Sequence, residues 1–117
     1  VILRGGGDTQ VRRRPDSRFV LKAFFDSQEI YHPSANLLLR SAAAEAHAPV
    51  AVILTGMGND GTAGARDFAA RNLPVLVQEP GTCAVDGMPC SAIREGLATA
   101  VLPAAALGRK LNTWLNP

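Results

Sequence analysis

The chain has 117 residues, which is enough for one hydrophobic core and too short for two ordinary domains. Its formal net charge is only +2, which gives no reason to expect a nucleic acid or a membrane surface as a partner. No apolar run approaches the roughly twenty residues that a transmembrane helix needs, so we expect no membrane insertion.

The first quarter of the chain predicts short strands joined by turns. Residues 1–3 have the composition of a strand end, and residues 4–8 form a glycine-rich turn. Residues 10–14 and 19–25 carry β-formers on either side of a Pro-Asp turn and predict a hairpin. The arginines within the first of these strands are expected to form a solvated face, as short charge runs usually do.

Residues 34–46 give the clearest helix in the chain. Pro33 and Ser34 supply a start signal, and the alanines that follow permit close packing against a sheet. We expect the Ser34 hydroxyl to cap this helix, because an N-cap oxygen already accepts from backbone donors and is a poor nucleophile. His32, in the preceding turn, could act as a base, but a lone loop histidine is more often structural.

The centre of the chain is a strand, a glycine loop and a helix. Residues 51–54 are continuously apolar, as in a strand buried on both faces, and residues 62–71 repeat alanines and a phenylalanine at helical spacing. The loop between them contains three glycines around Met57, Asn59 and Asp60. Such a loop lies at the carboxyl edge of an α/β sheet, where ligands usually bind.

Three interpretations of this loop remain open on the residues alone. Asp60 can cap the helix that follows, with the glycines supplying positive φ. The G-x-G-x-x-G order can hold a phosphate, although an acidic residue inside the loop would repel it. Asp60 can also orient a catalytic histidine, beside loop N–H groups suited to an oxyanion.

The last part of the chain repeats the alternation of strand and helix. Residues 74–77 and 100–102 predict strands, residues 90–95 a helix with Pro89 at its first position, and residues 104–115 a terminal helix in which Trp114 is an anchor through burial. This order predicts an α/β fold, a three-layer, doubly wound, mostly parallel sheet with helices on both faces.

Two cysteines, Cys83 and Cys90, lie seven residues apart. In an α/β chain of this composition we expect two free thiols and no disulfide. No further soft ligands cluster with them, so no metal site and no cofactor is expected.

The stretch VILTGMGNDGTAG, residues 52–64, resembles the catalytic domain of the CheB-type chemotaxis protein-glutamate methylesterases. The resemblance extends over most of the chain and is carried by further matching segments: the opening Val1-Ile2-Leu3 with Gly5-Gly6, His32-Pro33-Ser34, Leu37-Leu38-Leu39-Arg40-Ser41, Gln78-Glu79, Thr82-Cys83, Gly87-Met88-Pro89, Ala92-Ile93 and Val101-Leu102-Pro103. Three features depart from the family pattern, namely Asp86, Pro80 and the pair Tyr31-His32, and they bear on substrate contacts rather than on the fold.

The resemblance implies that Asp60 is the aspartate of a Ser-His-Asp triad. It also implies a substrate pocket or oxyanion region at Gly56, Met57, Gly58 and Met88. In the family the serine lies in a G-x-S-x-G-G stretch and precedes the histidine, and both come before the region matched here. Residues 1–117 are therefore expected to be the C-terminal portion of a CheB-like methylesterase catalytic domain, almost inactive alone.

The implied reaction is hydrolysis of glutamate methyl esters, with deamidation of certain glutamines by the same chemistry. The implied partner is a methyl-accepting chemotaxis receptor in the cytoplasm, whose acidic surface the arginine cluster could meet. A non-catalytic CheB-like interaction module and, less favoured, a nucleotide-binding α/β domain are the alternatives. If the upstream strands are absent, we also expect self-association through an exposed sheet edge.

Overall fold

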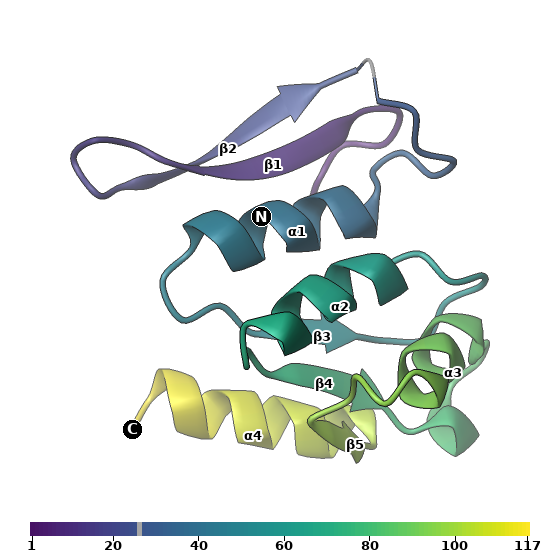
Figure 1. The fold of residues 1–117 in the computed structure, drawn as a ribbon. Coiled ribbons are helices and arrows are strands. Elements are labelled where there is room, and N and C mark those ends of the chain that lie inside the picture. Colours follow the sequence, from purple (N-terminus) through teal and green to yellow (C-terminus); the bar gives the residue numbers. More distant parts are fainter. Residues whose placement is uncertain (26) are drawn as a thin grey trace.

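The computed structural model describes residues 1–25 and 27–117. Figure 1 shows a β-hairpin lying on one helix, and below it a second helix that covers a small sheet. In chain order the elements are β1 (Asp8–Arg13), β2 (Phe19–Phe24), α1 (Ala35–Glu45), β3 (Ala51–Ile53), α2 (Thr62–Ala70), β4 (Val75–Gln78), the 3-10 helix η1 (Pro80–Thr82), α3 (Gly87–Arg94), β5 (Ala100–Leu102) and α4 (Ala104–Leu115).

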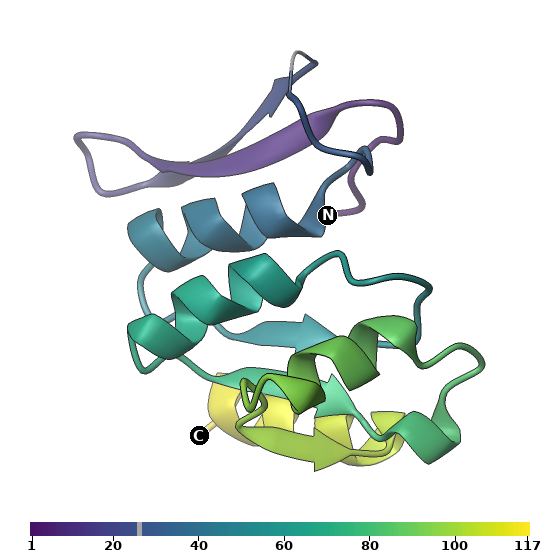
Figure 2. The ribbon, with the colours of Figure 1, turned by 45° about the vertical axis from the view of Figure 1, so that its right-hand side comes forward.

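The central sheet is parallel and has the strand order β3-β4-β5. Val75 and Val77 of β4 belong to the core cluster that α2 and α3 close from one side. Leu76, between them, points to the opposite face of the sheet, where α4 packs along β4. Figure 2 shows these layers, which confirm the predicted α/β fold with helices on both faces of a parallel sheet.

The predicted hairpin is confirmed, and it is fixed to α1 through the edge of β1. The amide of Val11 donates to Ser41 Oγ at 2.8 Å, and the amide of Arg13 donates to Glu45 Oε2 at 3.1 Å. These side chains satisfy donors that a free strand edge would leave to water. Arg12 and Arg14 are exposed, whereas the Arg13 guanidinium also donates to the Glu45 carbonyl.

Three sequence predictions about the elements are wrong. Residues 1–3 form no strand; Val1 and Ile2 are fully exposed, since no described strand lies beside them to pair with. Helix α3 begins at Gly87 rather than at Pro89, because the Asp86 carbonyl already accepts from the Cys90 amide. Trp114 is 42% exposed, because it lies against the loops before β3 and β4 and not against the sheet.

Strand β3 forms one edge of the central sheet. Within the described residues no strand pairs with its outer side. Ala51 and Ile53 are nevertheless buried, so this edge is apolar on the faces that the helices cover. The predicted self-association through the edge stays a prediction. None of the helices in the described ranges is long and apolar enough to cross a bilayer.

Candidate functional site

The loop of residues 54–61 leaves the carboxyl end of β3 and enters α2. Gly58 and Gly61 have φ values of +82° and +95°, which side chains rarely adopt, so the positive φ predicted for the three loop glycines is confirmed at these two and is wrong at Gly56. Gly61 is the N-cap residue of α2 and provides no side chain to cap it. The first amides of α2 therefore need acceptors from elsewhere in the chain.

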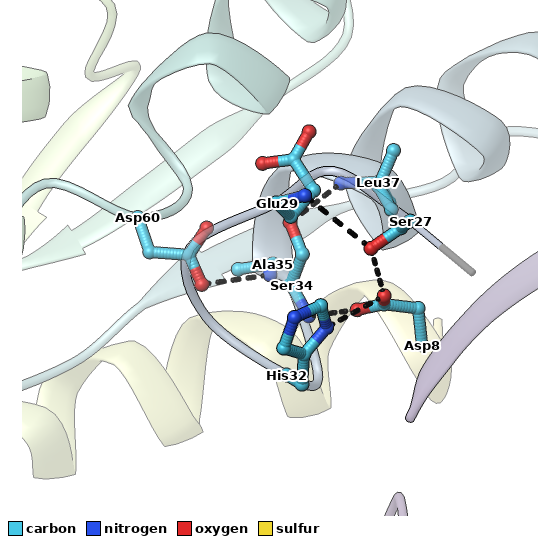
Figure 3. A network of polar contacts seen from close by, with 8 residues as sticks. All are labelled: Asp8, Ser27, Glu29, His32, Ser34, Ala35, Leu37 and Asp60. Carbon is cyan, nitrogen blue, oxygen red and sulfur yellow. Dashed lines mark hydrogen bonds and ion pairs between the residues drawn. The ribbon is translucent and has the colours of Figure 1, made fainter. Parts of the chain in front are cut away.

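The carboxylate of Asp60 binds the N-terminus of α1. Its Oδ2 accepts from the Ala35 amide at 2.8 Å (Figure 3), and its Oδ1 accepts from the Asn36 amide at 3.1 Å. The prediction that Asp60 caps the following helix is wrong, since its carboxylate accepts from two amides of α1 and from none of the helical residues 62–70 of α2. The carboxylate therefore lies at the positive end of the α1 dipole, where acidic side chains are commonly found.

A third backbone donor, the amide of Gly61 at 3.0 Å, also reaches Asp60 Oδ1. A carboxylate can accept about four hydrogen bonds, so the described residues leave room for one more donor, on Oδ2. Asp60 is only half-buried, so the residue is not enclosed by the described part of the chain. The loop thus holds an oriented carboxylate that can still accept a proton donor such as an imidazole N–H.

The loop is also joined to the second loop, residues 79–86, and to the start of α3. The Gly56 amide donates to the Val85 carbonyl at 2.8 Å, and the Met88 amide donates to the Gly56 carbonyl at 2.9 Å. A Cβ placed on Gly87 would approach the amide nitrogen and carbonyl oxygen of Gly58 to 3.0 Å. Glycine at position 87 therefore permits the two loops to lie in direct backbone contact.

The residues proposed from the sequence as a pocket are brought to this same sheet edge. A Cβ on Gly56 would collide with Met88 Sδ, so the two residues are in contact. Met88 is half-buried against the core cluster, whereas Met57 is 78% exposed. The hydroxyl of Tyr31 packs against Gly58 of the loop. The role of these residues in substrate binding stays a prediction.

A second carboxylate, that of Asp8, binds the same end of α1, although the sequence predicted only a turn at this position. Asp8 is fully buried at the start of β1. It accepts from the Ser34 amide at 2.7 Å, from His32 Nδ1 at 2.9 Å and from the Ser27 hydroxyl (Figure 3). Ser34 in turn caps α1 as predicted, since its Oγ accepts from the Leu37 amide at 3.3 Å.

Burial alone would raise the pKa of Asp8, but the hydrogen bonds from Ser27, Ser34 and His32 outweigh it and lower that pKa. The bond from His32 Nδ1 to Asp8 ties the turn before α1 to the start of β1, and the structural role of His32 stays a prediction. The three side chains do not form a Ser-His-Asp relay, since Ser27 donates to the carboxylate and not to the imidazole. No sequence pattern distinguishes this aspartate from an ordinary turn residue.

Both cysteines are free thiols, as predicted. Burial raises the pKa of Cys83 and of Cys90, and the negative charge of Asp86 raises both further. These thiols are protonated at neutral pH and are weak nucleophiles. Across residues 1–25 and 27–117, no three His, Cys, Asp or Glu side chains are grouped as metal ligands would be.

The chain that carries these loops is similar to proteins of a known family. Residues 1–111 match the family model described as CheB methylesterase. The chain belongs to the CheB methylesterase family. The crystal structure of the Thermotoga maritima CheB methylesterase catalytic domain superposes with a TM-score of 0.85 at 34% identity, covering 92% of this chain and 57% of that one. The CheB fold therefore holds for the described residues.

Curated relatives of the chain are named protein-glutamate methylesterases, in agreement with the family match. A protein-glutamate methylesterase/protein-glutamine glutaminase of Anaeromyxobacter dehalogenans is 46% identical over 87 residues, 74% of this chain and 25% of the relative. One of Xanthomonas campestris is 34% identical over 99% of this chain and 33% of its own length. The methylesterase FrzG of Myxococcus xanthus is 36% identical over 88% of this chain and 31% of its own. The chain thus spans a quarter to a third of the curated relatives it matches.

Proposed function

We propose that residues 1–117 form the C-terminal portion of a CheB-like catalytic domain, and that the complete domain is a protein-glutamate methylesterase that also deamidates glutamine. The observation that carries this proposal is Asp60, in the TGMGNDG loop, which accepts from three backbone N–H groups and for which the described residues supply no fourth donor. Its support from outside the chain is the family match and the names of the relatives.

In the proposed reaction this chain contributes the aspartate, and the preceding part of the domain contributes the serine and the histidine. The serine attacks the ester carbonyl while the histidine takes its proton, and methanol leaves when the histidine returns that proton. Water then releases the glutamate by the same route. Asp60 Oδ2 accepts from the imidazole, fixes its productive tautomer and stabilises the imidazolium.

We propose a methylated chemoreceptor as the substrate and the cytoplasm as the site of action. The support is the substrate class in the relatives' names, protein glutamate and protein glutamine. Exposed Arg12 and Arg14 on β1 and its turn offer positive charge to a partner rich in glutamate. The nucleotide-binding alternative is disfavoured, because Asp60 places a negative charge in the loop that would have to hold a phosphate.

The test of the catalytic role is Asp60→Asn in the complete protein. In a serine protease the equivalent change lowers kcat about 10⁴-fold, and we expect a loss of similar order in release of methanol from a methylated receptor. Asp67→Asn is the matched control, because Asp67 is a surface aspartate that pairs with Arg40 on α1. Unchanged turnover in Asp60→Asn would refute the proposal and favour a non-catalytic module.

The assignment as the C-terminal portion of the domain has a simpler test. The coding DNA immediately upstream of Val1 should contain, in frame, a G-x-S-x-G-G stretch and a later histidine. If that DNA encoded neither, Asp60 would have no partners, and the chain would be better described as an interaction module.

A further inference from the structure

We infer that Asn36 is a positioning residue for Asp60, a role that rests on the proposed function. Asn36 lies in the first turn of α1, and nothing in its sequence context distinguishes it from an ordinary polar helix residue. Its side chain reaches across to the loop and to the start of α2. There it fixes the backbone on which Asp60 is carried.

The side chain of Asn36 binds two amides of a different helix. Its Oδ1 accepts from the Gly61 amide at 3.0 Å and from the Gly64 amide at 3.0 Å. Gly64 is the N3 position of α2, whose amide an N-cap side chain normally binds, and Gly61 is the N-cap, whose amide is bound by a side chain in a capping box. Since Gly61 has no side chain, Asn36 caps α2 from α1.

The connection between the two helix ends runs in both directions. The Asp60 carboxylate accepts from the amides of Ala35 and Asn36, and the Asn36 side chain accepts from the amides of Gly61 and Gly64. Gly61 is bonded to both acceptors, since its amide also reaches Asp60 Oδ1. The position of the Asp60 backbone is therefore coupled to Asn36 through the next residue in the chain.

Close packing of α1 on α2 keeps this arrangement tight. A Cβ added to Gly64 would lie 2.5 Å from the Cβ of Leu39 and 3.2 Å from the carbonyl oxygen of Asn36. The absence of a side chain at position 64 is what allows its amide to reach Asn36 Oδ1. Removing the Asn36 amide group would leave the Gly61 and Gly64 amides without this acceptor and free the backbone next to Asp60 to shift.

A displacement of about 1 Å at a catalytic group can lower turnover about 100-fold. For Asn36→Ala in the complete protein we expect kcat to fall about 10- to 100-fold on this basis. We expect KM to change less than about twofold, because Asn36 acts on the carboxylate and not on ground-state substrate binding. Asn112→Ala is the matched control, since it removes an exposed asparagine from α4.

Asn36→Asp tests whether the acceptor oxygen at position 36, and not the asparagine as such, is what positions Asp60. Aspartate caps helices as well as asparagine does, so kcat on its plateau should return to within about threefold of the parent. The added negative charge near Asp60 should favour the imidazolium, and should therefore move the acid limb of the kcat profile to higher pH. The readout that separates the two roles is kcat, since a residue that only held the two helices together would lower the thermal stability of Asn36→Ala without lowering kcat at a temperature where the variant is folded.

The inference is overturned if Asn36→Ala retains full kcat, or if Asn36→Asp loses activity as Asn36→Ala does while remaining folded in thermal melts. These outcomes are separable from failure of the proposed function. If Asp60→Asn is inactive and Asn36→Ala fully active, only the role of Asn36 fails. If Asp60→Asn keeps full activity, the proposed function has failed first.

Discussion

Two aspartates accept from backbone amides at the N-terminus of α1, and they differ in burial and in their other hydrogen-bond donors. Asp8 is fully buried and accepts from two side chains and one amide, those of Ser27, His32 and Ser34. Asp60 is half-buried and, within the described residues, accepts from three backbone amides and from no side chain. The enclosed carboxylate has no contact with anything outside the fold, whereas the open one keeps an acceptor position for another molecule or another part of the domain.

Burial and hydrogen bonds alone distinguish Asp8, a structural carboxylate, from Asp60, a candidate catalytic one. Both have helix N-H groups and a favourable dipole, so neither feature alone marks a functional site. What differs is access: a catalytic carboxylate must be oriented by the protein and must still reach its partner. The two sites therefore respond differently to the same substitution.

The largest expected effect is on turnover. In the complete protein, Asp60→Asn should lower kcat about 10⁴-fold, whereas Asp8→Asn should leave kcat within about threefold at a temperature where both variants are folded. The measurement is methanol release at saturating methylated receptor. A large loss of kcat in folded Asp8→Asn would mean that the enclosed aspartate also takes part in the chemistry.

The next largest effect is on stability. Here we expect the large effect at Asp8, whereas the large effect on kcat is at Asp60. Asp8→Ala removes the shared acceptor and leaves the Ser34 amide buried without a partner, so we expect a loss of about 3 kcal/mol in the free energy of unfolding. Asp67→Ala, which breaks a surface ion pair with Arg40, should lose less than about 1 kcal/mol. Urea unfolding of the complete protein measures both, and equal losses would contradict the assignment of Asp8.

The response to acid should isolate Asp8. Its pKa is lowered in the folded state, so its contribution is fully present above its unfolded pKa, about 3.9, and is lost as pH falls through the lower folded value. We expect the free energy of unfolding to fall with a steeper slope below about pH 4 in the parent than in Asp8→Asn. Parallel curves from pH 6 to pH 2.5 would show that Asp8 has no depressed pKa.

The smallest expected effect concerns Ser34, the N-cap residue of α1. Ser34→Ala removes the oxygen that accepts from the Leu37 amide and keeps the Ser34 amide that binds Asp8. We expect a loss of about 1 kcal/mol, the usual value of an N-cap. Thr113→Ala, an exposed hydroxyl bonded within α4, serves as the control and should change stability by less than about 0.5 kcal/mol. Equal effects of the two substitutions would show that the Ser34 cap has no special weight.

The sequence by itself determined the local elements and the place of the site. The hairpin, α1, the strand of residues 51–53 and the glycine loop follow from signals that act within a few residues: alternation, helical spacing, a capping serine and positive φ at Gly58 and Gly61. The resemblance in the TGMGNDG loop also singled out Asp60 as the candidate catalytic residue.

Only the tertiary structure decided what each carboxylate binds. Asp60 reaches amides 25 and 24 residues earlier in the chain, Asn36 reaches Gly64 28 residues later, and Asp8 reaches Ser34 over 26 residues. No local pattern encodes these pairings, because they exist only after α1 packs on α2 and the hairpin packs on α1. The same reason explains the error at residues 1–3, where β-forming composition cannot supply the neighbouring strand that a strand requires.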